Sequence, residues 1–186
     1  MTDKPPLWVV CDTSGSMSEG GKRMILRNLI TYLHQVVRMC PELALTGSLR
    51  VVAWGNAADV VEFEEGEILP FSCVGKASVD SLANLLTAHL ANVSQPRLLL
   101  ISDGHWPLDE LERLVQWRRS MPHVSVRVIA AGYEASVHHL RQFVDASAIF
   151  KPEEIVAAVQ SWDHTKSAMF TEESRVPSSV DMRGGS

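Results

Sequence analysis

Oxygen-bearing side chains alternate along one short stretch near the start of the chain. Asp12, Ser14 and Ser16 place one carboxylate and two hydroxyls within five residues, directly after the apolar run 7–11. Such oxygens are the ligands that Mg²⁺ prefers, and Mg²⁺ keeps several waters, so few protein ligands are needed. The stretch therefore predicts a site for Mg²⁺ or Mn²⁺, and its low ligand charge would leave the metal electrophilic.

A second apolar run, residues 97–101, is followed by Ser102-Asp103-Gly104. If both runs are strands of one sheet, their carboxyl ends meet at the same edge, where ligands of open α/β sheets bind. Asp103 would then add a second carboxylate to the site, directly or through water. A vacant position on the metal would attract a carboxylate from another molecule, so we expect a protein partner that presents Asp or Glu.

Apolar periodicity gives the elements that must position these residues. Short apolar runs alternate with stretches whose apolar residues recur every three or four positions, which is typical of strands and amphipathic helices. Strands are predicted at 7–11, 48–54, 59–63, 97–101, 124–130 and 148–150, and helices at 21–39, 78–90, 108–117, 137–144 and 152–162.

This alternation predicts an α/β fold, a Rossmann-like open and mostly parallel sheet with helices on both faces. The turn at Gly55 and Asn56 predicts that the third strand pairs antiparallel with the second, as an edge strand. Residues 1–162 are predicted to form one domain. The periodicity stops after Trp162, and the segment 163–186 is interpreted as a flexible or partner-bound tail.

Charge and cysteine content exclude other classes of protein. The 186 residues carry a formal net charge of −5 with scattered basic residues, which argues against nucleic-acid binding. The apolar run near the start is too short for a signal peptide or a membrane span, so a cytoplasmic location without membrane contact is expected. Three widely spaced cysteines, Cys11, Cys40 and Cys73, offer no zinc-site spacing.

The sequence D-T-S-G-S-M at 12–17, after a strand and before a helix, resembles the D-x-S-G-S-M signature of von Willebrand factor A (VWA) domains, the metal-ion-dependent adhesion site (MIDAS). The resemblance covers about 7–162, and Ser102-Asp103-Gly104 stands where the family has T-D-G. It implies a VWA fold and a protein-binding function. It also implies metal ligands at Asp12, Ser14, Ser16 and Asp103, with a threonine from the loop before the second long helix.

That threonine is the position at which the chain departs from the family. A G-G-T or G-x-T element is usual there, whereas this chain has Gly75-Lys76-Ala77-Ser78, so Ser78 is the candidate ligand. A cation close to a divalent ion lowers metal affinity. Lys76 is therefore expected to point away from the metal or to pair with a nearby acidic residue, Asp103 or Asp80.

Three residues are predicted to form a partner-contact rim around the metal: Lys76, His105 and Trp106. Trp106 would serve as an aromatic anchor there, although a packed loop at 105–107 is the competing interpretation. Among VWA branches, the chain looks like the cytoplasmic TerY type of bacteria, which is associated with tellurite resistance. That resemblance implies a role in a stress-response or defence system.

Two other functions are alternatives to metal-dependent binding. The site could stay empty, with Asp12 and the serines capping a helix and the domain acting as a metal-independent scaffold. The chain could instead be a Mg²⁺-dependent phosphatase or phosphotransferase with Asp12 as nucleophile. Such enzymes place an acid two residues after the nucleophile, where this chain has Ser14. We therefore expect a binding module and no enzyme.

Overall fold

Six strands form one sheet in the computed structural model, which describes residues 6–39, 48–62 and 71–162. The spatial order is β3-β2-β1-β4-β5-β6, and only the edge pair β2 and β3 is antiparallel. The predicted fold class is thereby confirmed. The strands are β1 (Leu7–Asp12), β2 (Leu49–Trp54), β3 (Ala58–Val61), β4 (Arg97–Ser102), β5 (Ser125–Ala130) and β6 (Ile149–Phe150).

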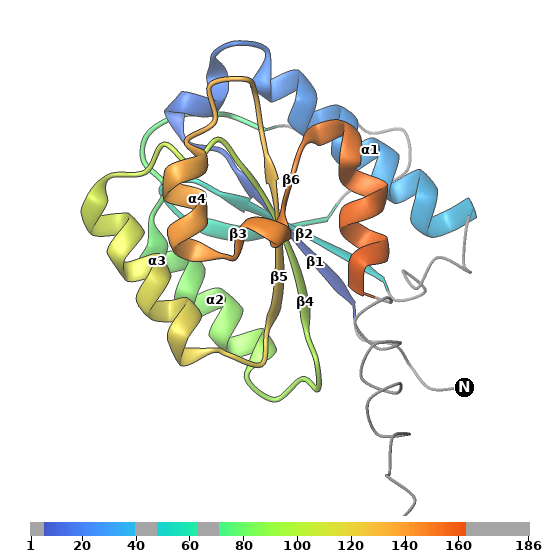
Figure 1. Ribbon diagram of the computed structural model, residues 1–186, viewed down its shortest axis with the longest axis vertical. Helices are drawn as coiled ribbons and strands as arrows, with labels where there is room; N and C mark the ends of the chain where they lie inside the picture. The colour runs from blue at the N-terminus through green and yellow to red at the C-terminus, as the bar shows by residue number, and fades with distance from the viewer. Residues whose placement is uncertain (1–5, 40–47, 63–70, 163–186) are drawn as a thin grey trace, which may run out of the picture.

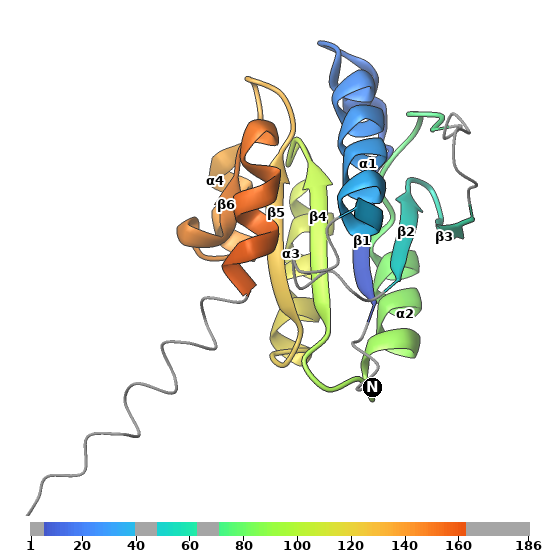
Figure 2. The same cartoon turned by 90° about the vertical axis from the view of Figure 1, so that its right-hand side faces the viewer.

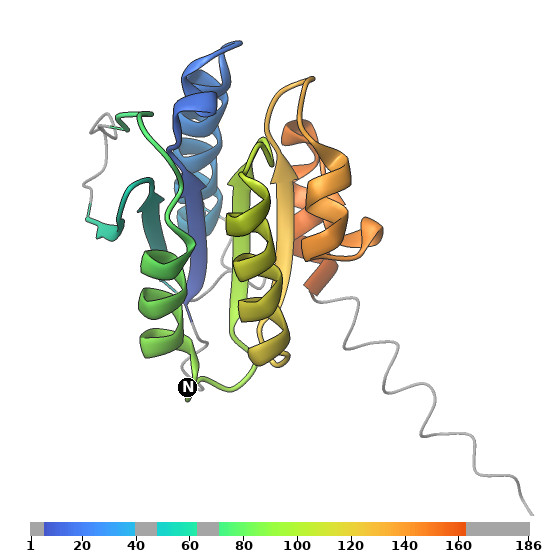
Figure 3. The ribbon, with the colours of Figure 1, turned by 90° about the vertical axis from the view of Figure 1, so that its left-hand side faces the viewer.

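Helices cover both faces of this sheet (Figure 1). One face carries α1 (Lys22–Met39) and the closing helix 155–162, which stand in front of the sheet in Figure 2. The other carries α2 (Val79–Leu90), α3 (Leu108–Ser120) and α4 (Val137–Phe143), which are in front in Figure 3. Because consecutive parallel strands need crossovers, the helices between them necessarily cover the sheet.

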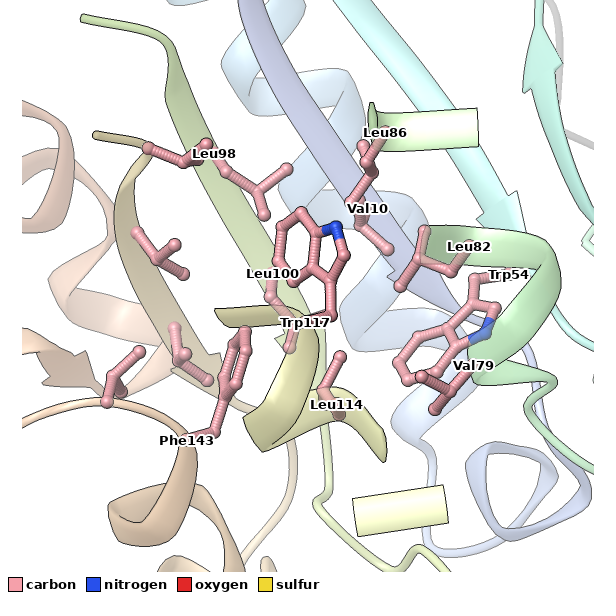
Figure 4. Close-up of a cluster of buried hydrophobic side chains, with 14 of the residues drawn as sticks. Val10, Trp54, Val79, Leu82, Leu86, Leu98, Leu100, Leu114, Trp117 and Phe143 are labelled. Carbon is pink, nitrogen blue, oxygen red and sulfur yellow. The ribbon is translucent and has the colours of Figure 1, made fainter. Parts of the chain in front are cut away.

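Two apolar cores follow from this arrangement, one on each face. All six residues of β1 are buried, as expected for a central strand that is covered on both sides. Its alternate side chains enter opposite cores: Val9 packs toward α1, and Val10 packs toward α2 and α3. Figure 4 shows Val10 in the core beneath α2 and α3, together with Trp54 and Trp117.

The predicted elements are all present, and their described ends lie within three residues of the prediction; the predicted end of the third strand, Phe63, lies outside the described residues. Both β1 and β4 extend one residue further than predicted, because Asp12 still pairs with Trp54 of β2 and Ser102 still pairs with Ala130 of β5. The closing helix begins with a 3-10 turn at Pro152–Glu154. The predicted tail at 163–186 lies outside the described residues.

No helix within 6–39, 48–62 or 71–162 is long and apolar enough to cross a bilayer.

Candidate functional site

The two predicted acidic positions lie at the carboxyl ends of adjacent central strands. Asp12 is the last residue of β1, Asp103 directly follows β4, and the two strands pair in parallel from Leu7 with Arg97 to Cys11 with Ile101. The chain leaves β1 toward β2 on one side and later returns to β4 on the other. This is the topological switch point, where open α/β sheets bind their ligands.

The loop after β1 brings the two serines to Asp103. The 3-10 turn Gly15–Ser18 follows Ser14, whose backbone N–H donates to Asp12 Oδ1 at 2.9 Å. The hydroxyls of Ser14 and Ser16 lie 3.2 Å apart, and Ser16 Oγ donates to Asp103 Oδ1 at 3.2 Å. Four of the five predicted metal ligands therefore form one connected cluster across 87 residues of sequence.

The donor set of this cluster fits a small hard cation. Metal–oxygen bonds of roughly 2.0–2.1 Å in an octahedron separate neighbouring ligand oxygens by about 3 Å. The oxygens of Ser14, Ser16 and Asp103 already have nearly that spacing. In the described part of the chain, no three His, Cys, Asp or Glu side chains gather as possible metal ligands. A hard cation such as Mg²⁺ or Mn²⁺ suits the oxygens present.

Asp12 is fully buried and is held by neutral donors. Its Oδ2 accepts from the Ser102 hydroxyl and from the indole N–H of Trp106, the latter at 3.0 Å. Burial raises the pKa of Asp12 above its ordinary value, and the hydrogen bonds from Ser102, Ser14 and Trp106 only partly offset that increase. With both carboxylate oxygens accepting hydrogen bonds, Asp12 fixes the loop conformation; its role as a metal ligand remains a prediction.

Asp103 is equally buried but has a cationic partner. The ammonium of Lys22 donates to Asp103 Oδ2 at 2.7 Å, and the backbone N–H of His105 donates to Oδ1 at 3.1 Å. Burial by itself would raise the pKa of Asp103, but the hydrogen bonds from Lys22 and His105, together with the Lys22 charge, lower it overall. Asp103 therefore stays ionised in the protein interior.

Lys22 and Ser102 are the site residues that the sequence analysis missed. Lys22 is the first residue of α1, follows two glycines, and is only 4% exposed. A signal was available: a lysine at a helix N-terminus opposes the helix dipole, so it needs an acidic partner nearby. Ser102 had its own signal as the polar end of a buried apolar strand, since a buried hydroxyl requires a hydrogen-bond partner.

Ser78 has a different role from the other predicted ligands. It is the N-cap of α2, where its hydroxyl accepts from the backbone N–H of Ser81 at 3.4 Å. Its loop still reaches the site, because the Gly15 N–H donates to the Gly75 carbonyl at 3.0 Å. In the part of the chain that the structure describes, no hydrogen bond joins Ser78 to the serine and aspartate cluster. Its role as a metal ligand remains a prediction.

The three predicted rim residues differ in their exposure. Lys76 and His105 are exposed near the cluster, and the His105 imidazole lies 3.4 Å from Asp103 Oδ2. Of the alternatives expected for Lys76, pairing with Asp103 is not realised, because Lys22 is the cation at that carboxylate, and the Lys76 residue is exposed. The rim position of Trp106 is wrong, and the competing interpretation of a packed loop fits instead: Trp106 is 4% exposed, because it packs on Trp54 and donates to Asp12.

Solved structures share the fold. The chain is similar to a von Willebrand factor type A protein from Catenulispora acidiphila (16% identity, TM-score 0.56, covering 86% of this chain and 42% of that one). It is also similar to manganese-loaded TRAP protein from Plasmodium vivax (15% identity, TM-score 0.60, covering 84% of this chain and 72% of that one). A third similar structure is proximal thread matrix protein 1 from the mussel byssus with a zinc-occupied MIDAS motif (12% identity, TM-score 0.56, covering 87% of this chain and 47% of that one).

These likenesses establish that the chain has the VWA fold. The chain spans less than half of the Catenulispora and mussel proteins. No protein-family model matches the sequence, and no curated protein matches it. The fold thus rests on three-dimensional similarity, and the site rests on the geometry of its own residues.

Proposed function

We propose that this chain is a metal-dependent protein-interaction module that binds an acidic side chain of a partner protein at the cluster formed by Ser14, Ser16 and Asp103. One observation carries the proposal: two hydroxyls and one carboxylate from separate strand ends are spaced as ligands of a small hard cation. The manganese and the zinc-occupied MIDAS motif named for two structures of the same fold support it.

The residues of the site have different roles in this proposal. Ser14, Ser16 and Asp103 would hold Mg²⁺ or Mn²⁺, which when bound supplies an electrophilic position for a carboxylate. Asp12 positions the first loop through the Ser14 N–H, and Trp106 and Ser102 hold Asp12 in place. We propose Ser78 as a further ligand, and Lys76 and His105 as exposed residues that contact the partner.

Catalysis by Asp12 fits the geometry poorly. A nucleophilic carboxylate needs an oxygen that can reach the substrate and a base or metal that activates the reaction. Asp12 is fully buried, and its two oxygens already accept hydrogen bonds from three donors. The phosphatase alternative therefore gains no support, and binding without turnover is the proposed activity.

The wider setting of the proposal comes from the likeness of this small chain to the stand-alone TerY-type VWA domains of bacteria. On that basis we propose a cytoplasmic bacterial protein that acts in a stress-response or defence system, with no contact to nucleic acid or membrane. The formal net charge of −5 is consistent with a partner that is not nucleic acid.

Replacement of Ser16 by alanine tests the metal site. Ser16→Ala removes the hydroxyl between Ser14 and Asp103, and we expect Mg²⁺ and Mn²⁺ affinity measured by calorimetry to fall at least about tenfold. Ser18→Ala is the matched control, because Ser18 is exposed and donates only to the Gly15 carbonyl. Asp12→Ala should also abolish metal binding, because the loop loses its anchor.

Partner recognition is tested with a peptide library in which each peptide that contains Glu has a matched peptide with Gln at the same position. Capture of Glu peptides should require metal, disappear in EDTA, return with Mg²⁺, and be lost in Ser16→Ala. Equal capture with and without EDTA would instead favour the metal-independent scaffold. Ser78→Ala is included because a loss of metal affinity beyond that of Ser18→Ala would assign Ser78 as a ligand.

A further inference from the structure

The site contains a cation of its own. Lys22 and Asp103 form an ion pair at 2.7 Å, with side chains that are 5% and 0% exposed. A buried charge is costly unless it is paired, so each of these two groups depends on the other. The ammonium therefore stays at this carboxylate, unlike an exposed lysine that exchanges partners with water.

The fold holds Lys22 in this position from several sides. Gly20 and Gly21 adopt positive φ angles of 57° and 74°, and the Lys22 N–H donates to the Glu19 carbonyl at 3.0 Å as α1 begins. The aliphatic part of the lysine then crosses Gly132, beyond the end of β5. A Cβ on Gly132 would lie 3.0 Å from Lys22 Cγ and 3.2 Å from Cδ. The space over Gly132 is thus occupied by the lysine stem.

Asp103 also belongs to the cluster of candidate metal ligands. Its Oδ2 accepts from Lys22, and its Oδ1 accepts from the Ser16 hydroxyl. A divalent ion held by Ser14, Ser16 and Asp103 would share one carboxylate with an ammonium. The two cations would lie within the roughly 4–6 Å over which neighbouring charges strongly affect one another. Each cation therefore lowers the affinity of Asp103 for the other.

We propose that Lys22 is a tethered cation that competes with the divalent metal for Asp103, which keeps the site assembled without metal and weakens metal binding. This inference rests on the proposed metal-binding function. In metal-free protein, Lys22 neutralises Asp103 at Oδ2, and the Ser16 hydroxyl stays aligned on Oδ1. Metal binding then requires Lys22 to share the carboxylate or to give it up, so the domain responds only to higher concentrations of divalent ion.

Removal of the ammonium tests the competition. Lys22→Met keeps the length of the stem over Gly132 and removes the charge. We expect Mn²⁺ and Mg²⁺ to bind about tenfold more tightly than to the wild-type chain, measured by calorimetry and by Mn²⁺ electron paramagnetic resonance. Arg23→Met is the matched control: it removes one positive charge from the next residue of α1, which is exposed, and should change the affinity by less than about twofold.

Thermal unfolding gives a second readout that needs no partner protein. In EDTA, Lys22→Met should melt below the wild-type chain, because Asp103 loses its counter-charge. Saturating Mn²⁺ should raise its Tm more than it raises the wild-type Tm. The double variant Lys22→Met with Asp103→Asn should recover part of the lost stability in EDTA and lose the response to Mn²⁺. If Lys22→Met does not fold, Lys22→Gln replaces it in both measurements.

The outcomes separate this inference from the proposed function. Tighter binding by Lys22→Met supports the competition, even if the wild-type chain binds no metal, in which case the metal-dependent function fails for the native chain. Equal or weaker binding by Lys22→Met than by a metal-binding wild type shows that Lys22 only orients Asp103, and it overturns the inference alone. Absence of metal binding by both proteins overturns both.

Discussion

Two carboxylates at the same sheet edge are treated in opposite ways by their surroundings. Asp12 and Asp103 end adjacent strands, and both are fully shielded from solvent. The pKa of Asp12 is raised, because burial outweighs its neutral hydrogen-bond donors. The pKa of Asp103 is lowered despite burial, because Lys22 supplies a hydrogen bond and a charge. Burial alone therefore does not determine the charge state at this site.

This difference assigns the two residues to different tasks. Asp12 accepts from three fixed donors, so it acts as the internal support of the loop that presents Ser14 and Ser16. Asp103 accepts from Lys22 and from Ser16, so its charge is directed to the place where a cation would bind. Loss of one donor to Asp12 should therefore lower the stability of the fold moderately, whereas loss of the Lys22–Asp103 ion pair should lower it strongly.

The largest expected effect is that of Asp103→Ala. It leaves the Lys22 ammonium buried without a partner, and breaking a buried pair in this way costs about 3–5 kcal/mol. Urea unfolding in EDTA measures the loss. The double variant with Lys22→Met should be more stable than Asp103→Ala alone, because no unpaired charge remains. A loss below about 1 kcal/mol in the single variant would show that the ion pair is not essential to the fold.

A smaller effect is expected when Asp12 loses a donor. Trp106→Phe keeps the aromatic packing against Trp54 and removes the N–H to Asp12, at a cost of about 2 kcal/mol. Trp117→Phe is the control, because its N–H donates to the neutral Thr87 hydroxyl at 3.2 Å, and it should cost about 1 kcal/mol. If urea unfolding shows that both variants lose the same free energy of unfolding, the hydrogen bond to the Asp12 carboxylate is no stronger than the one to the Thr87 hydroxyl.

The smallest expected effect is on the pH dependence of stability, where the two carboxylates should act in opposite directions. Asp103 has a lowered folded pKa, so its stabilisation is present above the ordinary Asp pKa and is lost as pH falls through the folded value. Asp12 has a raised folded pKa, so its contribution is present at low pH and is lost as pH rises through the folded value.

Metal-free unfolding from about pH 7 down to about pH 3 should therefore separate the two residues. The stability advantage of the wild-type chain over Asp103→Asn should shrink as pH falls, whereas its stability relative to Asp12→Asn should increase. Changes of the same sign in both comparisons would show that Asp12 and Asp103 experience similar surroundings.

The sequence was sufficient for the elements and for most of the cluster. A strand buried on both faces reads as a continuous apolar run, and helices reveal their apolar stripe, so β1, β4 and α1 were predicted to within two residues of their ends. The hairpin of β2 and β3 followed from the turn at Gly55 and Asn56. Because parallel strands end at one edge, the sequence alone places Asp12 and Asp103 together.

Tertiary structure alone decided which neighbours these carboxylates have. Lys22 reaches Asp103 across 81 residues of sequence, and Trp106 reaches Asp12 across 94. Neither separation leaves a local pattern, because a side chain's direction depends on turns such as that at Gly20 and Gly21 and on space such as that over Gly132. The sequence determined that oxygen ligands gather at this edge; only packing determined that one carboxylate is held by neutral donors and the other by a cation.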